Sequence, residues 1–416
     1  MAWNRIRSGL TFLVLIMLPG FSAYAQDLRA LQLFEDADMR PYGNWAQPKE
    51  GFYASFDGLF WYMNAPDKQT VGFGNTSRLV MAGTGNLAFG TPAASLIVTS
   101  TATDQYVETS TFDTGDFRDK WKAGDRIELG YTGEHDGFLI STFELNTFTL
   151  HSGAANVPVV FQDPPFGATN RHLLENVFGL DVNGNPIWGN VPVVYDTLRV
   201  TNMTKPTGVE AMYTYRDHQL HRGGQLQWMI GARYLEIKDE YLVDGIGGGL
   251  GDTHIDSLAK NEIFGPQVGV RFYQPFGRFA ISSEGRFAAT VNSEQIRVTS
   301  VMGTNLSEPA NPLLFTDPNT LLPILLPRLM GPTSGETSAH YYFFTPLVEF
   351  RVEGHVQVTQ SISAKVGWNA VWMDNIARGS GVLDYSVPQV GITTASHGNR
   401  QDLFMQGLSL GVELNR

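Results

Sequence analysis

The chain contains no cysteine among its 416 residues. A disulfide framework is therefore excluded as a source of stability. After the N-terminal region there is also no run of about 18 consecutive apolar residues, the length that a transmembrane helix needs. Basic residues are fewer than acidic ones, with 29 Lys and Arg and 41 Asp and Glu. This acidic balance argues against nucleic acid as a partner.

Two common enzyme signatures are also missing. The sequence has no HExxH zinc motif and no GxxxxGK[ST] phosphate-binding loop. The Gly-rich segment 241–256 carries Asp244, Asp252 and Asp256, which are weak candidates for ligating a hard cation such as calcium. Their spacing matches no EF-hand, so a flexible loop is the favoured interpretation. We therefore expect no enzymatic activity, no metal site and no cofactor.

The first 25 residues (1–25) have the three parts of a secretory signal peptide. Two arginines precede the apolar stretch 10–18, and the small residues Ala23 and Ala25 follow it. We expect cleavage after residue 25 and export of the remaining chain. Residues 26–50 would then form a short periplasmic N-terminal segment.

Apolar and polar residues alternate through much of the rest of the sequence. In 348–356, for example, Val348, Phe350 and Val352 alternate with charged residues. Such alternation is typical of β-strands with unlike faces, because successive side chains point to opposite sides. The strongest alternating segments are 51–63, 125–132, 137–147, 206–216, 224–240, 262–273, 277–294, 340–357, 361–374 and 403–415.

The connections between these segments are long and short in turn. The long ones are 64–124, 148–205, 241–261, 295–339 and 375–402, and the short ones lie near 133–136, 217–223, 274–276 and 358–360. Outer-membrane barrels have short periplasmic turns and longer extracellular loops. The sequence therefore predicts an all-β fold, a single transmembrane antiparallel β-barrel of about ten strands over 51–416, rather than a soluble secreted sandwich.

Alternation also assigns the two faces of the predicted strands. The polar face would line the lumen with Arg126, Glu128, Glu144, Glu210, Arg216, Arg233, Arg271, Glu284, Arg286, Glu349, Arg351, Glu353, His355, Lys365 and Glu413. The apolar face would meet lipid through Phe56, Phe60, Trp228, Phe264, Phe287, Phe350, Trp368 and Leu410. The charges could form an internal salt-bridge network, line a narrow pore, or bind a ligand. The salt-bridge network is the favoured interpretation.

Several segments resemble a known family, the seventh of the named β-barrel porin families of outer-membrane proteins. The similar stretches are 33–61, 125–141, 229–240, 261–273, 345–379 and 403–414, and the hairpin in 345–379 ends in an Asn-x-x-Arg element at Asn375 and Arg378. Arg416 departs from the terminal aromatic residue of many outer-membrane barrels. The resemblance implies a barrel and, by the family's name, a pore.

Two functions remain open at this point. One is passive passage of small solutes through a narrow polar lumen. The other is a closed barrel that acts as a structural or adhesion platform through its external loops, because a ten-stranded barrel is close to the size whose interior side chains fill. Either protein would sit in the outer membrane with lipid and the barrel assembly machinery as partners. The sequence does not fix the oligomeric state.

Overall fold

The structure is a computed structural model. It describes residues 50–73, 77–81, 104–108, 110–118, 120–162, 174–175, 190–217, 220, 224–248, 250–306, 314–316, 323–325, 328–329, 331–359, 361–387, 389–393 and 400–415. The predicted signal peptide, nearly all of the segment 26–50 and the central parts of most long connections lie outside the described residues. Among the described residues, no helix is long and apolar enough to cross a membrane.

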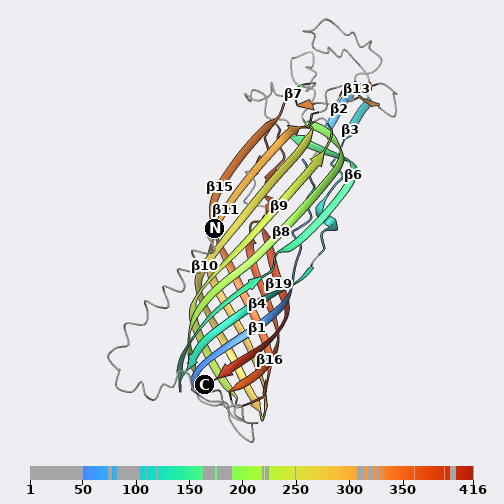
Figure 1. The fold of residues 1–416 in the computed structure, drawn as a ribbon. Coiled ribbons are helices and arrows are strands. Elements are labelled where there is room, and N and C mark those ends of the chain that lie inside the picture. Colours follow the sequence, from blue (N-terminus) through green and yellow to red (C-terminus); the bar gives the residue numbers. More distant parts are fainter. Residues whose placement is uncertain are drawn as a thin grey trace.

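Ten antiparallel strands close into a ring (Figure 1). They are β1 (Gly51–Met63), β4 (Lys120–Thr132), β5 (Asp136–Leu145), β8 (Asn190–Arg216), β9 (Gln225–Ile246), β10 (Asp252–Phe276), β11 (Phe279–Thr304), β15 (Thr333–Gln357), β16 (Ile362–Ile376) and β19 (Gln401–Asn415). The order around the ring is β5-β4-β1-β19-β16-β15-β11-β10-β9-β8, and pairing of β5 with β8 closes it. The predicted all-β fold with about ten antiparallel strands is confirmed.

An eleventh strand, β6 (Phe148–Gln162), was not predicted. It follows β5 after two residues and pairs with the first half of β8, whereas β5 pairs with the second half. The two therefore share one edge of β8, one above the other. Alternation is lost in the middle of β6, where Gly153, Ala154 and Ala155 stand together, and this is why the sequence pattern placed it in a loop.

The short turns, the start of β1 and the end of β19 lie at one end of the barrel. Hydrogen bonds close the turns at this end, for example Gly133 N to Asp136 O at 2.7 Å and Val358 N to Ile362 O at 2.9 Å. The connection 241–261 was predicted to be long, and this is wrong. The strand β9 runs on to Ile246 and β10 begins at Asp252, so that only a tight turn through the positive-φ residues Gly247, Gly248 and Gly251 joins them. Alternation weakens there, but the backbone pairing continues.

Five strands of the ring, β8, β9, β10, β11 and β15, continue beyond it at the opposite end, where β6 pairs with β8. Figure 1 shows these strands reaching well above β1, β16 and β19. The extension is an incomplete ring, and its concave face carries a large apolar core. Part of that core comes from the segment after β16, which contains the short helix η5 (Gly379–Gly381) and the strands β17 (Leu383–Asp384) and β18 (Gly391–Ile392).

The remaining elements are short and lie at the loop end of the barrel. They are the helix η2 (Thr114–Asp116) and the strands β2 (Ser77–Met81), β3 (Asp104–Glu108), β7 (Leu174–Glu175), β12 (Leu314–Thr316), β13 (Pro323–Leu325) and β14 (Arg328–Leu329). Two of the long connections therefore contain a short strand pair, β2 with β3 in 64–124 and β12 with β13 in 295–339. A third pair, β7 with β14, joins the connections 148–205 and 295–339. The sequence pattern predicted none of them.

Close packing of β10 against β11 gives a test of the inward face. A Cβ atom added to Gly265 would lie 2.3 Å from the carbonyl oxygen of Ala289, whereas one added to Gly285 on β11 would meet nothing within 4 Å. We expect Gly265→Val to cost about 1–3 kcal/mol, the usual range for overpacking. Gly285→Val is the matched control and should change stability little. The measurement is the midpoint temperature of the shift between folded and unfolded bands on detergent gels, and equal midpoints for the two variants would contradict the packing.

Candidate functional site

A cluster of buried charges fills the lower part of the barrel interior. We call it the charge cluster; its members are Asp57, Arg126, Glu128, Glu210, Arg233, Arg271, Glu284, Arg286, Glu349, Arg351, Glu353, His355 and Lys365. Eleven of these residues are less than a tenth exposed. The other two are Arg271 and Lys365, whose side chains are 20% and 7% exposed. Leaving His355 aside, acidic and basic members are equal in number, so that the cluster is close to neutral.

Eight of these side chains form a closed circuit in which Arg and Glu alternate. Its links are Arg351–Glu349 at 3.1 Å, Glu349–Arg233, Arg233–Glu210 at 2.6 Å, Glu210–Arg286, Arg286–Glu284, Glu284–Arg271 at 2.5 Å, Arg271–Glu128 at 3.9 Å and Glu128–Arg351 at 3.6 Å. Each charge in the circuit has two neighbours of opposite sign. This arrangement compensates much of the cost of removing the charges from water.

The circuit crosses the lumen. Glu128 on β4 pairs with Arg271 on β10, although β5, β8 and β9 separate these strands around the ring. Arg126, also on β4, reaches Asp57 on the adjacent β1 at 3.1 Å and Glu353 on the more distant β15 at 3.4 Å. Side chains on strands that are not neighbours can meet only through the middle of the barrel. The cluster therefore occupies the interior rather than lining its wall.

Strand periodicity supplies these charges without special backbone geometry. On β15 the inward positions are the odd-numbered ones, and they place Glu349, Arg351, Glu353 and His355 in one row. The charges of this row alternate in sign from Glu349 to Glu353. Arg351 contacts Glu349, two positions away on the same strand, at 3.1 Å and Glu128 on β4 at 3.6 Å.

An apolar layer covers the charge cluster on its loop side. It consists of the buried residues Leu59, Trp61, Met63, Leu145, Phe148, Leu235, Ile237, Ile263, Ala288, Leu347, Val371, Met373, Ile376, Leu403 and Met405. These residues come from strands all around the ring, and the indole ring of Trp61 lies 5.9 Å from the ring of Phe143 on β5. Two layers of side chains thus cross the interior, one of paired charges and one of apolar residues.

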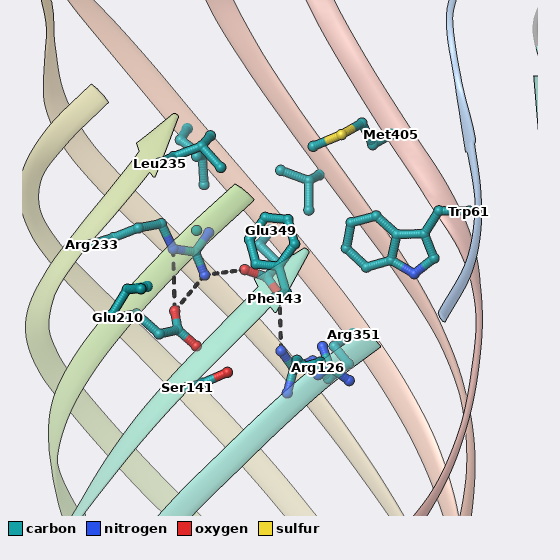
Figure 2. Close-up of a pocket in the computed structure, with 14 residues that line it drawn as sticks. Trp61, Arg126, Ser141, Phe143, Glu210, Arg233, Leu235, Glu349, Arg351 and Met405 are labelled. Carbon is teal, nitrogen blue, oxygen red and sulfur yellow. Dashed lines mark hydrogen bonds and ion pairs between the residues drawn. The ribbon is translucent and has the colours of Figure 1, made fainter. Parts of the chain in front are cut away.

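A small cavity remains between the charge cluster and the apolar layer. Figure 2 shows its lining, with Arg233 held between Glu210 and Glu349 on one side and Trp61 and Met405 on another. The volume open to the centres of water-sized molecules is about 20 Å³. Since one water needs about 10–15 Å³ by this measure, the cavity can hold water.

Above the apolar layer, the segment 377–393 enters the barrel and is anchored by an ion pair. Nη1 of Arg378 donates to Oδ2 of Asp239 at 3.0 Å, and neither side chain is exposed to solvent. The same carboxylate accepts hydrogen bonds from Thr204 Oγ1 at 2.7 Å and from Gly379 N at 2.8 Å. We call 377–393 the inserted segment.

The residue that turns the chain inward is Asn375. Its φ of 59° lies in the left-handed region, which Asn tolerates better than most residues. Its side-chain amide donates to the carbonyl of Phe344 at 3.0 Å, and its own carbonyl accepts from Asn292 at 3.3 Å. The Asn-x-x-Arg element thus ends β16 and directs Arg378 towards Asp239.

A second buried ion pair lies near the anchor. Arg400 Nη2 pairs with Glu294 Oε2 at 3.1 Å, and its guanidinium carbon lies 3.1 Å from the ring centre of Phe343. Burial raises the pKa of the Glu294 carboxyl although Arg400 stabilises its charged form. The barrel interior at this level is therefore polar but occupied.

The structure places most of the charges predicted to face the lumen on the inward face. Arg126, Glu128, Arg233, Arg271, Glu284, Arg286, Glu349, Arg351, Glu353, His355, Lys365 and Glu413 all occupy inward strand positions, and so do Glu210 and Arg216. Glu144 is the exception, and its lumenal assignment is wrong. It lies on the outward face of β5 and pairs with Lys205 at 2.6 Å, with both side chains more than a third exposed.

The predicted apolar face points outward. Phe56, Phe60, Trp228, Phe264, Phe287, Phe350, Trp368 and Leu410 are each between 38% and 65% exposed. Side chains of this size and exposure are unusual on the surface of a protein surrounded by water.

The three aspartates considered for a cation do not converge. Asp244 Oδ1 lies 2.6 Å from Nδ1 of His254, whereas Asp252 accepts from Gly247 N at 3.2 Å and from Asn305 Nδ2 at 2.7 Å. Asp256 stands on the same outward face of β10, and all three belong to strands rather than to a loop. In the part of the chain that the structure describes, no cluster of three or more His, Asp or Glu is arranged to hold a metal ion.

Some residues of the interior were missed by sequence reasoning. Asp57 lies on β1 between the outward residues Phe56 and Gly58, so the alternation itself could have found it. Asp239 and Arg378 could not be paired by pattern, because they meet only when the inserted segment folds back.

The sequence also contains a G-x-S-x-G spacing at 407–411. Ser409 lies within β19 and accepts a hydrogen bond from Asn369 at 3.1 Å, which differs from the exposed strand-to-helix turn of a hydrolase nucleophile.

Comparisons with solved structures return low similarities. The outer membrane protease OmpT from Escherichia coli has 8% identity and a TM-score of 0.32, with 90% of this chain and 99% of that chain covered. A Pseudomonas aeruginosa FadL homologue has 6% identity and a TM-score of 0.20, with 88% and 90% covered. The CymD monoaromatic hydrocarbon channel has 7% identity and a TM-score of 0.17, with 88% and 89% covered. No curated protein matches the chain in sequence.

The closed antiparallel ring and its apolar outer surface define an outer-membrane β-barrel. Residues 193–415, more than half of the chain, match the model of a family described as "Putative beta barrel porin-7 (BBP7)". The chain belongs to this family.

The buried anchor can be tested by removing one charge. Asp239→Ala would leave Arg378 buried without a counter-ion, and we expect a loss of about 3–5 kcal/mol in stability. Glu144→Ala removes one half of an exposed pair and should cost about 0–1 kcal/mol. The measurement is the urea midpoint of unfolding in detergent micelles, followed by tryptophan fluorescence.

A double variant separates the ion pair from general packing. Asp239→Leu with Arg378→Leu removes both charges, and we expect it to be more stable than Asp239→Ala because no unpaired charge remains. Equal losses in the single and double variants would contradict the anchor.

Proposed function

We propose that this outer-membrane barrel is closed to solutes in the state described and acts through its loop-bearing end, as a structural or adhesion platform. The observation that carries the proposal is the set of ion pairs between strands that are not neighbours, Glu128–Arg271 foremost. A conducting lumen needs a continuous column of water, which these pairs and the apolar layer above them interrupt. Delivery would follow export through the leader at 1–25 and insertion by the barrel assembly machinery.

The long strands support a role for the loop-bearing end. β8, β9, β10, β11 and β15 extend beyond the closed ring, and the apolar core of the extension includes residues of the inserted segment. This core gives the loops a rigid base at a distance from the membrane. Rigid scaffolds that present loops are a common arrangement for binding functions.

Passage of small solutes is the second candidate function. It is favoured by the family's description as a porin and by the charged residues of the interior. Passage would require the charge cluster to separate and the apolar layer to part in the same event. Since breaking one buried pair costs about 3–5 kcal/mol when a charge is left unpaired, an open state would be rare without a ligand or partner that stabilises it.

Planar-bilayer recording distinguishes the two functions. We expect the purified protein to show no discrete conductance steps in potassium chloride solution, because the interior holds no continuous water path. Insertion is verified independently by the heat-dependent band shift of the same protein recovered from lipid. Reproducible steps that scale with protein concentration would contradict the closed barrel and support passage of small solutes.

A further inference from the structure

The outward face changes character abruptly partway along the strands β8 to β11. In the rows nearest the turn end, every outward position of β9 is apolar or aromatic, from Leu226 to Tyr234. The next three outward positions are Glu236, Lys238 and Glu240. The same change falls between Val209 and Thr207 on β8, between Phe264 and Glu262 on β10, and between Val291 and Ser293 on β11.

These changes coincide because the residues lie in one register. Phe264 pairs with Tyr234 on one side and with Val291 on the other, and Tyr234 pairs with Val209. One step further along the strands, Glu262 pairs with Glu236 and with Ser293. The boundary is therefore a line across four adjacent strands and not a scatter of single substitutions.

Ion pairs form a girdle immediately beyond the boundary. Lys205, Lys238 and Lys260 lie side by side in the next row. Lys260 reaches Glu236 at 3.2 Å and also contacts Glu262, and Lys238 reaches Glu236 at 3.1 Å. Two glutamates within reach of Lys260 raise the pKa of its ammonium group against the opposing effect of burial. Charges arranged in this way are stable in water or among lipid headgroups, and costly in hydrocarbon.

The height of the apolar part matches a bilayer. On β10 it runs from Phe264 to Phe276 beside the turn end, with Phe264 61% and Phe276 59% exposed. At about 3.4 Å per residue and a tilt of about 40°, this stretch spans roughly 30 Å. The hydrocarbon core of a bilayer is also about 30 Å thick.

The apolar face surrounds the whole barrel. Exposed members include Phe60 on β1, Leu129 on β4, Ile140 on β5, Ile230 on β9, Phe287 on β11, Phe350 on β15, Trp368 on β16 and Leu410 on β19. A second copy of the chain would cover one side only. A lipid bilayer is the partner that covers all sides at once.

We infer that the bilayer covers only the half of the barrel next to the turns, and that its loop-side surface crosses β8 to β11 between the Tyr234–Phe264–Val291 row and the Glu236–Glu262–Ser293 row. The strands beyond that line, Asp252 to Ile263 on β10, rise roughly 30 Å into the aqueous phase by the same geometry. The inserted segment and its Arg378 anchor then lie outside the hydrocarbon. This inference does not depend on whether the lumen conducts.

Single cysteines on β11 test the boundary, since the natural chain has none. Phe287→Cys and Val291→Cys lie on the apolar side, and Gln295→Cys and Thr299→Cys are matched positions on the same outward face beyond the line. The protein is placed in nanodiscs of phosphatidylcholine and phosphatidylglycerol, which leave both ends open to reagent. We expect a charged, membrane-impermeant maleimide to label positions 295 and 299 at least about 10-fold faster than 287 and 291, because the reaction needs a thiolate in water.

Two further measurements keep the test decisive. All four variants should label alike after unfolding in urea, which shows that the differences come from the environment and not from intrinsic reactivity. Equal labelling of the four in nanodiscs would overturn the inference, and so would protection of 295 and 299 to the level of 287. Cross-linking between copies through position 287 in nanodiscs would instead assign the apolar face to a second copy, and would also overturn it.

Discussion

Ion pairs across the lumen are the constraint on which the interior of this barrel depends. Ten strands are close to the number whose interior side chains just fill, and the longest links, such as Glu128 with Arg271, need the ring to be closed and of this width. A wider ring would leave those charges apart and exposed to water. A narrower ring would have no room for the eight-membered circuit of Arg and Glu. Strand number and interior chemistry therefore specify one another.

The fold could be predicted from the sequence because apolar and polar residues alternate with a period of two along its strands. Alternation located part of every strand of the ring, although the loop-side parts of β8, β9, β10, β11 and β15 were assigned to connections. The inward or outward side of a residue such as Arg351 or Trp368 followed from the same count. Glu144 shows the limit of the method. Alternation places Glu144 on the outward face of β5, but its charge suggested a place in the lumen. Lys205 on β8 provides a partner for this charge on the outside of the barrel.

Pairing between distant segments could not be predicted in this way. Nothing in the local sequence of Asp239 indicates that its partner is Arg378, because the contact depends on the turn at Asn375 and on the path of the inserted segment. The strand β6 was not predicted, for a related reason. Its backbone pairs with β8 over most of its length, but small and polar residues in its middle remove the alternation that would mark it. Pairing depends on the backbone, whereas the pattern reports only the side chains.

The apolar layer and the charge cluster stabilise one another. An ion pair is stronger where water is excluded, and residues such as Trp61, Leu235 and Met405 exclude water from the loop side of the cluster. The pairs in turn neutralise charges that would otherwise hydrate the lumen and separate the apolar layer from its support. A substitution in either layer should therefore weaken both. It follows that an open lumen would be a different packing of the whole interior rather than the displacement of one residue.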